Sequence, residues 1–501
     1  MASHSLHSDK NVTQGAVMAG APVEDALPAV EQFSAEADNA AAASSEVRWR
    51  PSYPIFGNEY LDRQEAIESN ARTYPRRLPL ALKSGRGIRV WDVEGREYID
   101  CLAGAGALAL GHNHPVVVEA IQNALSEEVP FQTLDLPTPL KDRFIRELYE
   151  SLPPPFEKQF KIQFCGPSGA DAIEAALKLV KTATGRRGLL AFHGAYHGMT
   201  LGTMSVSGES VPKAAIGGLS AEVQFLPFPS DYRCPFGIGG QAGADIGLRY
   251  IETILDDPNS GVLLPAGMLL EVIQGEGGVN CVPDAWLRDI RRLTERYGIP
   301  LIIDEVQTGL GRTGRLYAFQ HAGVMPDVLV LSKAIGGGLP LSVVLYRRDL
   351  DLWRPGAHAG TFRGNQLAFV AGAATIRYVR EQGLDVNAAE MGCVLRAELE
   401  AIAREESCIA DVRGRGLMIG VEVVDESRDG AVAGRPSSSG KLSRAIQHEC
   451  LRRGLIVELG GRNSAVVRML PPLILALSDV EAIVDRFRDA VRAAARGAAS
   501  A

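Results

Sequence analysis

The chain has 501 residues, of which 46% are hydrophobic and 22% charged, and its formal net charge is -8 at pH 7. This composition is ordinary for a soluble enzyme, and the negative charge gives no reason to expect nucleic acid or an anionic membrane as a partner. No apolar run approaches the roughly 18 residues of a membrane span. Seven scattered cysteines without a CxxC pair predict a cytoplasmic protein with neither a disulfide framework nor a metal site.

The beginning of the chain differs in composition from the rest. Residues 1–46 are rich in alanine and serine with scattered acids, and lack the basic start and apolar stretch of a signal peptide. We predict a mostly disordered extension over residues 1–53. We then expect the N-terminal part of a small domain at 54–111, a large cofactor-binding domain at 112–382, and the C-terminal part of the small domain at 383–501.

Local patterns predict most elements of these domains. Residues 89–100 alternate apolar and polar side chains around Glu94-Gly95, which is typical of a β-hairpin. His112 and His114 could ligate a metal, but a loop before a helix at 116–125 is the favoured interpretation. Other predicted helices and strands lie at 160–164, 171–182, 189–192, 268–273, 284–297, 341–346, 366–381, 391–403, 417–424, 439–453, 455–458, 466–469 and 478–495, while 202–261 and 425–438 are expected to be mostly loop.

Two turns at the ends of predicted strands could contact a ligand. The small-residue turn at 165–170 leads into a helix, and a helix N-terminus after such a turn is a generic anion site. Asp171 would oppose an anion if it pointed inward, so we expect it to cap or to point away. Tyr196 lies among glycines, where it could stack on a planar ligand or be a core tyrosine. His193 and His197 are four residues apart, but the glycines disfavour a helix and hence a metal pair.

Two short apolar runs form the centre of the sequence. Residues 301–303 end at Asp304, and residues 328–331 end at Ser332-Lys333. The helix-compatible segment between them predicts a βαβ unit with parallel strands, whose ligand would lie beyond the carboxyl ends of the strands. The residues expected at this edge are Ser168, Gly169, Tyr196, Glu276, Asp304 and Lys333. Glu271, inside the preceding apolar run, needs a polar partner.

An acid and a lysine at neighbouring strand ends, with an aromatic ring and an anion site nearby, fit pyridoxal phosphate. Lysine can form a Schiff base with the aldehyde, and the carboxylate can keep the pyridine nitrogen protonated. The alternative is that Asp304 and Lys333 form a structural ion pair, which a glycine-flanked cleft makes the weaker interpretation.

The stretch from Pro300 to Gly314, together with Leu331 to Pro340, resembles the signature of the class III aminotransferases, and the resemblance spans about 58–491. It implies an α/β fold of fold type I, with a mostly parallel central sheet in a large domain and a smaller α+β domain. It also implies a homodimer or a higher homo-oligomer. The cofactor roles that it implies are Lys333 as Schiff-base lysine and proton shuttle, Asp304 at the pyridine nitrogen, Gln307 near the ring hydroxyl, Ser168, Gly169 and Ala170 at the phosphate, Tyr196 on the ring, and Thr361 at the phosphate of the neighbouring subunit.

The resemblance also implies a substrate-binding pair. Arg468 matches the family arginine that binds the α-carboxylate of 2-oxoglutarate, and Glu276 matches the glutamate that neutralises it when an ω-amine donor enters. The ornithine and GABA enzymes carry an arginine where this chain has Met199. Several stretches, among them 68–77, 101–106, 165–171, 231–237 and 459–461, resemble the diaminobutyrate–2-oxoglutarate group.

That group implies a ping-pong transfer of the 4-amino group of L-2,4-diaminobutyrate to 2-oxoglutarate, giving aspartate 4-semialdehyde and glutamate. The resemblance also implies that the reaction runs in cells towards diaminobutyrate, which feeds siderophore, peptide or polyamine-type pathways. The alternatives are the diaminobutyrate enzyme of ectoine synthesis, another ω-aminotransferase that uses ornithine, lysine or GABA, an aminomutase, and a non-catalytic regulator that binds the cofactor. A regulator would need a DNA-binding module, and residues 1–46 show no basic helix-turn-helix pattern.

Overall fold

The structure is a computed structural model that describes residue 53 and residues 57–220, 222–430 and 435–499. Two units are distinguished, Met1–Trp49 and Arg50–Ala501, and the described residues all belong to the second. The predicted disordered extension therefore lies, except for Tyr53, outside the described residues. None of the helices within the described ranges is long and apolar enough to pass through a membrane.

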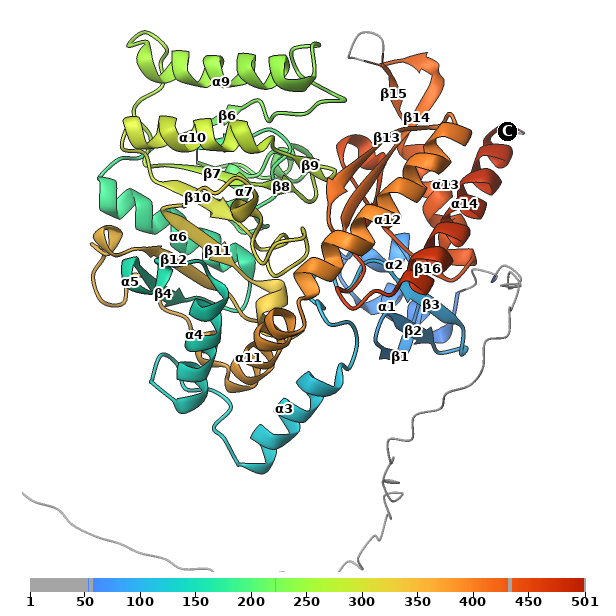
Figure 1. The fold of residues 1–501 in the computed structure, drawn as a ribbon, viewed down its shortest axis with the longest axis horizontal. Coiled ribbons are helices and arrows are strands. Elements are labelled where there is room, and N and C mark those ends of the chain that lie inside the picture. The colour runs from blue at the N-terminus through green and yellow to red at the C-terminus, as the bar shows by residue number, and fades with distance from the viewer. Residues whose placement is uncertain (1–52, 54–56, 221, 431–434, 500–501) are drawn as a thin grey trace, which may run out of the picture. The chain divides into compact units, whose positions relative to one another are not determined.

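A seven-stranded, mostly parallel sheet forms the core of the larger group of elements (Figure 1). Only β12 runs antiparallel to its neighbours β11 and β4, while the remaining pairs are parallel. This confirms the predicted α/β fold. In spatial order the strands are β4 (Phe160–Phe164), β12 (Val343–Arg347), β11 (Val328–Leu331), β10 (Leu301–Asp304), β7 (Gly267–Glu271), β5 (Leu189–Phe192) and β6 (Val223–Leu226).

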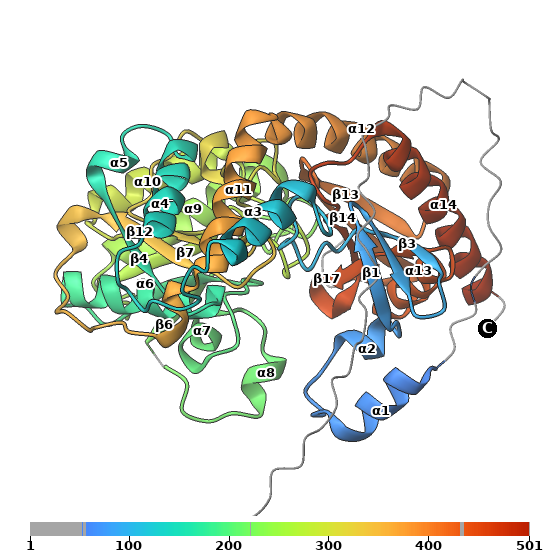
Figure 2. The same ribbon diagram turned by 90° about the horizontal axis from the view of Figure 1, so that it is seen from below.

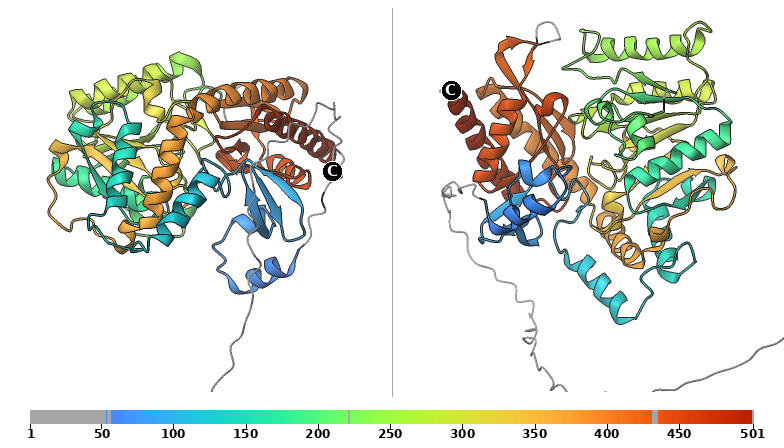
Figure 3. Two further views of the ribbon diagram at one scale, coloured as in Figure 1. Left: turned by 60° about the horizontal axis from the view of Figure 1, so that its bottom comes forward. Right: turned by 180° about the vertical axis from the view of Figure 1, so that it is seen from behind.

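The central strands are buried on both faces because helices cover the sheet from both sides, as Figure 3 shows. Along β10, Ile302 packs in the cluster that includes helix α6 (Gly169–Thr184). Leu301 and Ile303 point the other way, into the main core. This alternation follows from the two-residue period of a strand, and it explains why these strands read as continuous apolar runs. The main-core side includes residues of α4 (Pro139–Ser151), α10 (Asp284–Arg296) and α11 (Gln366–Glu381).

Smaller sheets are built from both ends of the described chain. The predicted hairpin is confirmed as β2 (Arg89–Asp92) and β3 (Glu97–Asp100), which join β1 (Leu82–Arg86) and β16 (Leu455–Ile456). A five-stranded sheet contains β13 (Ile409–Arg415), β14 (Met418–Asp429), β18 (Val466–Met469), β17 (Glu458–Gly460) and β15 (Pro436–Ser438). Helices α12 (Leu384–Glu405), α13 (Gly440–Arg452) and α14 (Leu477–Ala499) accompany these strands (Figure 2). The domain boundaries stay a prediction.

Three predictions about local structure were wrong. The segment between β10 and β11 is not an α-helix but a series of turns with one short 3-10 helix, Ala318–His321, because glycines such as Gly311 and Gly314 adopt positive φ there. The supposed loop at 202–261 contains β6 and the helix α9 (Gly240–Asp256). The supposed loop at 425–438 instead extends β14 and adds β15. The remaining helices and short strands are α1 (Glu59–Ile67), α2 (Tyr74–Arg77), α3 (Pro115–Ser126), α5 (Phe156–Gln159), α7 (Leu201–Val206), α8 (Val211–Ala214), β8 (Ile273–Gln274) and β9 (Asn280–Cys281).

Candidate active site

Asp304 and Lys333 lie at the carboxyl ends of the neighbouring parallel strands β10 and β11. The register pairs Asp304 with Val330, so the two strands end at the same edge of the sheet. Lys333 has a φ of 49°, a left-handed backbone conformation that is uncommon for a residue other than glycine. Burial lowers the pKa of the Lys333 amine, and the negative charge of Glu276 offsets part of that effect. A lysine held in this way offers a neutral, nucleophilic amine more readily than a free one.

The Asp304 carboxylate is held by two donors and is buried. The His197 ring places Nδ1 2.7 Å from Asp304 Oδ2, and the Val306 amide donates to Oδ1 at 2.9 Å. Both side chains are almost completely excluded from solvent. The histidine thus fixes the orientation of the acid that a bound cofactor would meet. Sequence reasoning missed this role because it considered His197 only as one half of a metal pair.

Glu271, the buried acid of β7, connects two loops of the same edge. Its carboxylate accepts the amide hydrogens of Tyr196 at 3.0 Å and Gly275 at 2.9 Å, so the polar partners expected from the sequence are present. Burial raises the pKa of Glu271, and the nearby His197 acts against this. The half-buried phenol of Tyr196 also has a raised pKa, because of burial and then of the charge of Glu276. Tyr196 therefore lies within electrostatic reach of Glu276.

The turn before α6 has the compactness that phosphate binding requires. Ser168 caps the helix, its hydroxyl accepting from the Asp171 amide at 3.3 Å. A Cβ atom on Gly169 would come within 2.9 Å of Val306 Cγ1, so only glycine fits without displacement. The first amides of a helix have no partner within it and are available to an anion.

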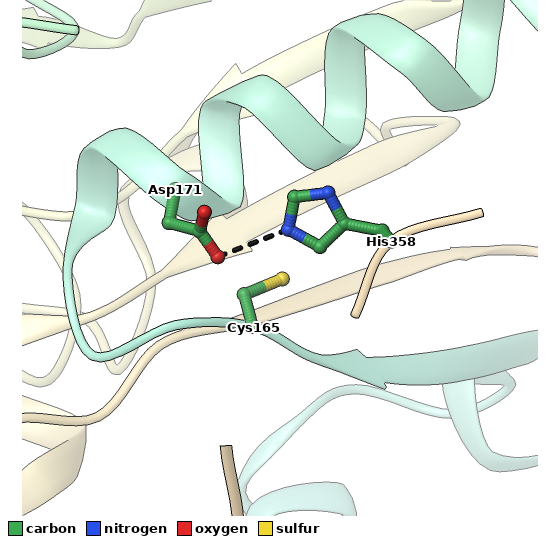
Figure 4. A group of neighbouring side chains, drawn as sticks. All are labelled: Cys165, Asp171 and His358. Atoms are coloured by element: carbon green, nitrogen blue, oxygen red, sulfur yellow. Dashed lines mark hydrogen bonds and ion pairs between the residues drawn. The ribbon is translucent and has the colours of Figure 1, made fainter. Parts of the chain in front are cut away.

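Asp171 directs its carboxylate towards His358 and so ties the turn before α6 to a segment far along the chain (Figure 4). Its Oδ2 accepts the Gly166 amide at 2.5 Å and lies 2.9 Å from His358 Nε2. The hydrogen bond from His358 is the main reason that the pKa of Asp171 is lowered. Cys165 completes a group that has the spacing of metal ligands, but the acid oxygen already receives two donors, so we interpret the group as a clamp.

The clamp also positions the segment that carries Thr361. Gly360 packs against Gly166 of the same chain, and Thr361 begins a short 3-10 helix with an exposed side chain. The expected contact of Thr361 with the cofactor of a neighbouring subunit stays a prediction.

Gln307 brings an unsatisfied acceptor to the same edge. Its Nε2 donates to the Ala105 carbonyl at 3.3 Å, whereas its buried Oε1 has no hydrogen-bond partner among the described residues. The backbone at Gly275 passes so close that a Cβ atom there would overlap Oε1. A buried acceptor without a partner is costly, so a donor from a ligand would stabilise it.

Arg468 and Glu276 form an ion pair, with 2.7 Å between Nη2 and Oε1. The side chain of Arg468 is 1% exposed and that of Glu276 is 38% exposed. Two further nitrogens of the arginine, Nε and Nη1, are buried without hydrogen-bond partners in the described structure. The pair predicted from the sequence is therefore formed, and its guanidinium keeps donors free for a ligand carboxylate.

Two further features of the sequence are Met199 and the loop at 231–237. Met199 is 54% exposed. The loop at 231–237 contacts the five-stranded sheet through the ion pair of Arg233 with Glu422 of β14. In the same loop, Asp231 accepts the Gly240 amide at 2.6 Å at the start of α9. This loop thus has clear structural roles.

The chain belongs to the Aminotransferase class-III family, whose sequence model matches residues 70–491. It is 56% identical over 424 residues to the "Diaminobutyrate--2-oxoglutarate aminotransferase" of Rhizobium meliloti (85% of this chain, 90% of the relative). It is 48% identical over 432 residues to the protein of that name from Haemophilus influenzae (86% and 94%). Among solved structures, it resembles the ornithine aminotransferase of Toxoplasma gondii, with a TM-score of 0.73 and 26% identity (87% of this chain, 95% of the other). A PLP-bound amine transaminase from an uncultivated Pseudomonas species gives 0.75 and 27% (85% and 98%).

Proposed function

We propose that this aminotransferase uses pyridoxal phosphate to transfer the 4-amino group of L-2,4-diaminobutyrate to 2-oxoglutarate, giving aspartate 4-semialdehyde and glutamate. The observation that carries the proposal is the ion pair between the buried Arg468 and the partly exposed Glu276, both of which act electrostatically on Lys333. It provides a reversible carboxylate site next to a nucleophilic amine. The names of the relatives at 56% and 48% identity support the choice of donor.

The residues at the sheet edge fit the cofactor. Asp304 presents a fixed, buried carboxylate for a protonated ring nitrogen, and Gln307 Oε1 lacks a donor that a ring hydroxyl would supply. The compact turn at Ser168, Gly169 and Ala170 suits a phosphate. We assign Tyr196 to the ring face and Thr361 to the phosphate of the neighbouring subunit in a homodimer.

When bound, pyridoxal phosphate supplies an aldehyde that captures amines and a ring that spreads negative charge. Lys333 would hold the cofactor through its amine. With the donor bound in its place, Lys333 Nζ would act as the general base that removes the proton from the carbon bearing nitrogen and as the general acid that returns it. The lowered pKa of Lys333 favours the neutral form of this amine, which can accept that proton. Asp304 would keep the ring nitrogen protonated.

Arg468 and Glu276 would let one pocket accept two unlike substrates in turn. While a donor amine reacts, Glu276 neutralises the arginine. When 2-oxoglutarate enters, its α-carboxylate replaces Glu276 and makes charge-assisted hydrogen bonds to the guanidinium. The 38% exposure of the Glu276 side chain is compatible with such a movement.

We place the enzyme in the cytoplasm, where the same reaction, running in the reverse direction, would supply diaminobutyrate to a siderophore, peptide or polyamine-type pathway. The cysteines of the described residues are all free thiols, which is compatible with a reducing compartment.

The function is tested by assaying the purified holoenzyme with 2-oxoglutarate and a panel of diamines and ω-amino acids. Glutamate should form fastest with L-2,4-diaminobutyrate, and Lys333→Ala should abolish transfer. Reduction with borohydride should attach the cofactor to Lys333 in the wild type. Faster glutamate formation from ornithine or 4-aminobutyrate would overturn the choice of donor, and full turnover by Lys333→Ala would overturn the mechanism. Arg468→Ala should impair the half-reaction with 2-oxoglutarate more than that with the diamine.

A further inference from the structure

Glu458 lies beside the Arg468–Glu276 pair but belongs to none of the roles assigned above. In the register of β17 and β18, Glu458 is directly opposite Arg468. Side chains that are opposite each other in an antiparallel pair emerge on the same face, with Cβ atoms about 4.5–5.5 Å apart. Gly460, two residues further along, is on that face as well, since its Cβ atom would lie 2.6 Å from Arg468 Nε. Glu458 therefore points toward the space in which the guanidinium of Arg468 lies.

The Glu458 carboxylate is buried and only partly satisfied. The residue is 2% exposed, and its Oε1 accepts the Leu459 amide at 3.0 Å. Its Oε2 is also buried but has no hydrogen-bond partner among the residues that the structure describes. A buried ionised acid is costly unless it is paired, so this oxygen is suited to receive a cationic donor.

The nearest guanidinium pairs with Glu458 only loosely. Arg77 Nη1 lies 3.6 Å from Glu458 Oε1, which is an ion-pair distance but too long for a good hydrogen bond. The Arg77 side chain is 42% exposed, so a ligand can reach it. The two residues thus present a carboxylate and a guanidinium side by side, and each can still bind a charged group of a ligand.

Helix α2, which carries Arg77, also brings Tyr74 to this space. Burial raises the pKa of the Tyr74 phenol, and the charges of Glu458 and Glu276 and a hydrogen bond to Glu458 add to the effect, whereas Arg468 acts against it. Glu458 lies opposite Arg468 in the strand pair, Arg77 is the ion-pair partner of Glu458, and Glu276 is that of Arg468. The Arg77–Glu458 pair and the Arg468–Glu276 pair are therefore neighbours at this end of β17 and β18.

We propose that Glu458 and Arg77 recognise the α-amino-acid end of the amine donor, with Glu458 binding its α-ammonium group and Arg77 its α-carboxylate. This inference rests on the proposed function. In diaminobutyrate the reacting 4-amine and the α-carbon are separated by two methylene groups, so the far end carries both charges at once. A paired acid and base complement that end, whereas a donor with a carboxylate alone would leave Glu458 without a cation.

Three donors that differ by one group test the assignment in half-reactions of the holoenzyme. L-2,4-Diaminobutyrate carries both distal groups, 4-aminobutyrate only the carboxylate, and 1,3-diaminopropane only the ammonium. Glu458→Gln should lower kcat/KM for diaminobutyrate and diaminopropane by about 10- to 100-fold and spare 4-aminobutyrate, since charged hydrogen bonds are being lost. Arg77→Gln should lower kcat/KM for diaminobutyrate and 4-aminobutyrate and spare diaminopropane.

Glu422→Gln is the matched control, because Glu422 is a buried acid of the same five-stranded sheet but is paired with Arg233 and Arg413. It should leave the ratios between donors as they are in the wild type, even if stability falls. Equal losses for all three donors in Glu458→Gln would show a purely structural role and overturn the proposal. If the wild type proves to prefer ornithine, the proposed function fails separately, and the pair of ornithine and 5-aminovalerate then tests Glu458 in the same way.

Discussion

Replacing His197 by leucine tests whether the fixed orientation of Asp304 matters for catalysis. The substitution removes the 2.7 Å contact between His197 Nδ1 and Asp304 Oδ2 and leaves that oxygen without the donor. Asp304 is 5% exposed, so water can replace the lost donor only poorly. Leaving a buried polar atom unsatisfied costs about 1–3 kcal/mol. If this cost appears fully in the transition state, kcat/KM should fall by about 5- to 150-fold.

The assay is kcat/KM for His197→Leu, with His197→Asn as the conservative variant. Asparagine can place its amide donor near the position of Nδ1, so it should recover most of the activity. Full activity in His197→Leu would refute the idea that the histidine positions Asp304.

Three further predictions concern the cofactor site. Gly169→Ala should weaken pyridoxal phosphate binding by about tenfold or more, because the new Cβ atom lies 2.9 Å from Val306 Cγ1 and overpacking costs about 1–3 kcal/mol. Equilibrium dialysis measures the affinity. The control is Gly188→Ala, whose Cβ atom has nothing closer than 3.9 Å and which should leave the affinity unchanged. Asp171→Ala should lower the free energy of unfolding by about 1 kcal/mol near neutral pH. This loss is smaller than that expected for a buried charged hydrogen bond, because water screens the Asp171 side chain, which is 38% exposed. The pKa of Asp171 is lowered in the folded state, so the difference in unfolding free energy between wild type and variant should vanish as the pH falls below that pKa. Chemical denaturation that gives the same difference at acidic pH as at neutral pH would contradict this. The rate at which the apoenzyme captures the cofactor can be measured by visible absorbance as a function of pH. Because burial lowers the pKa of Lys333, this rate should reach half its maximum at a pH below the ordinary lysine pKa of about 10.4. A midpoint at or above that pH would contradict the prediction.

The residues that carry the chemistry could be predicted from the sequence because they are local to strand ends. Asp304 and Lys333 each follow an apolar run, and parallel strands in one sheet bring their carboxyl ends to one edge. The same reasoning anticipated partners for Glu271. The connection between β10 and β11 was predicted wrongly, since its glycines allow a chain of turns in place of the expected helix. Helix α9 was missed because its first turn consists of small and polar residues that give no apolar period.

Contacts that join distant parts of the chain could not be predicted in this way. His197 and Asp304 are 107 residues apart, and His358 and Asp171 are 187 apart. Neither pair leaves a periodic signal, because a single hydrogen bond between loops imposes no repeat on the sequence. Such pairs are visible only when the fold brings the loops together.

The same distinction separates chemistry from selectivity in this enzyme. The edge of the seven-stranded sheet supplies Lys333 and Asp304, and these residues would serve any amine. The residues that we propose to recognise the acceptor and the donor, Arg468 and Glu458, come from the five-stranded sheet, where a one-residue change of register between β17 and β18 would turn one of them away from the other. Selectivity therefore depends on how β17 and β18 pair. Gly460 contributes to it because any side chain at this position would collide with the guanidinium of Arg468. Donor preference can then change through β17 and helix α2 while the residues that hold the cofactor remain as they are.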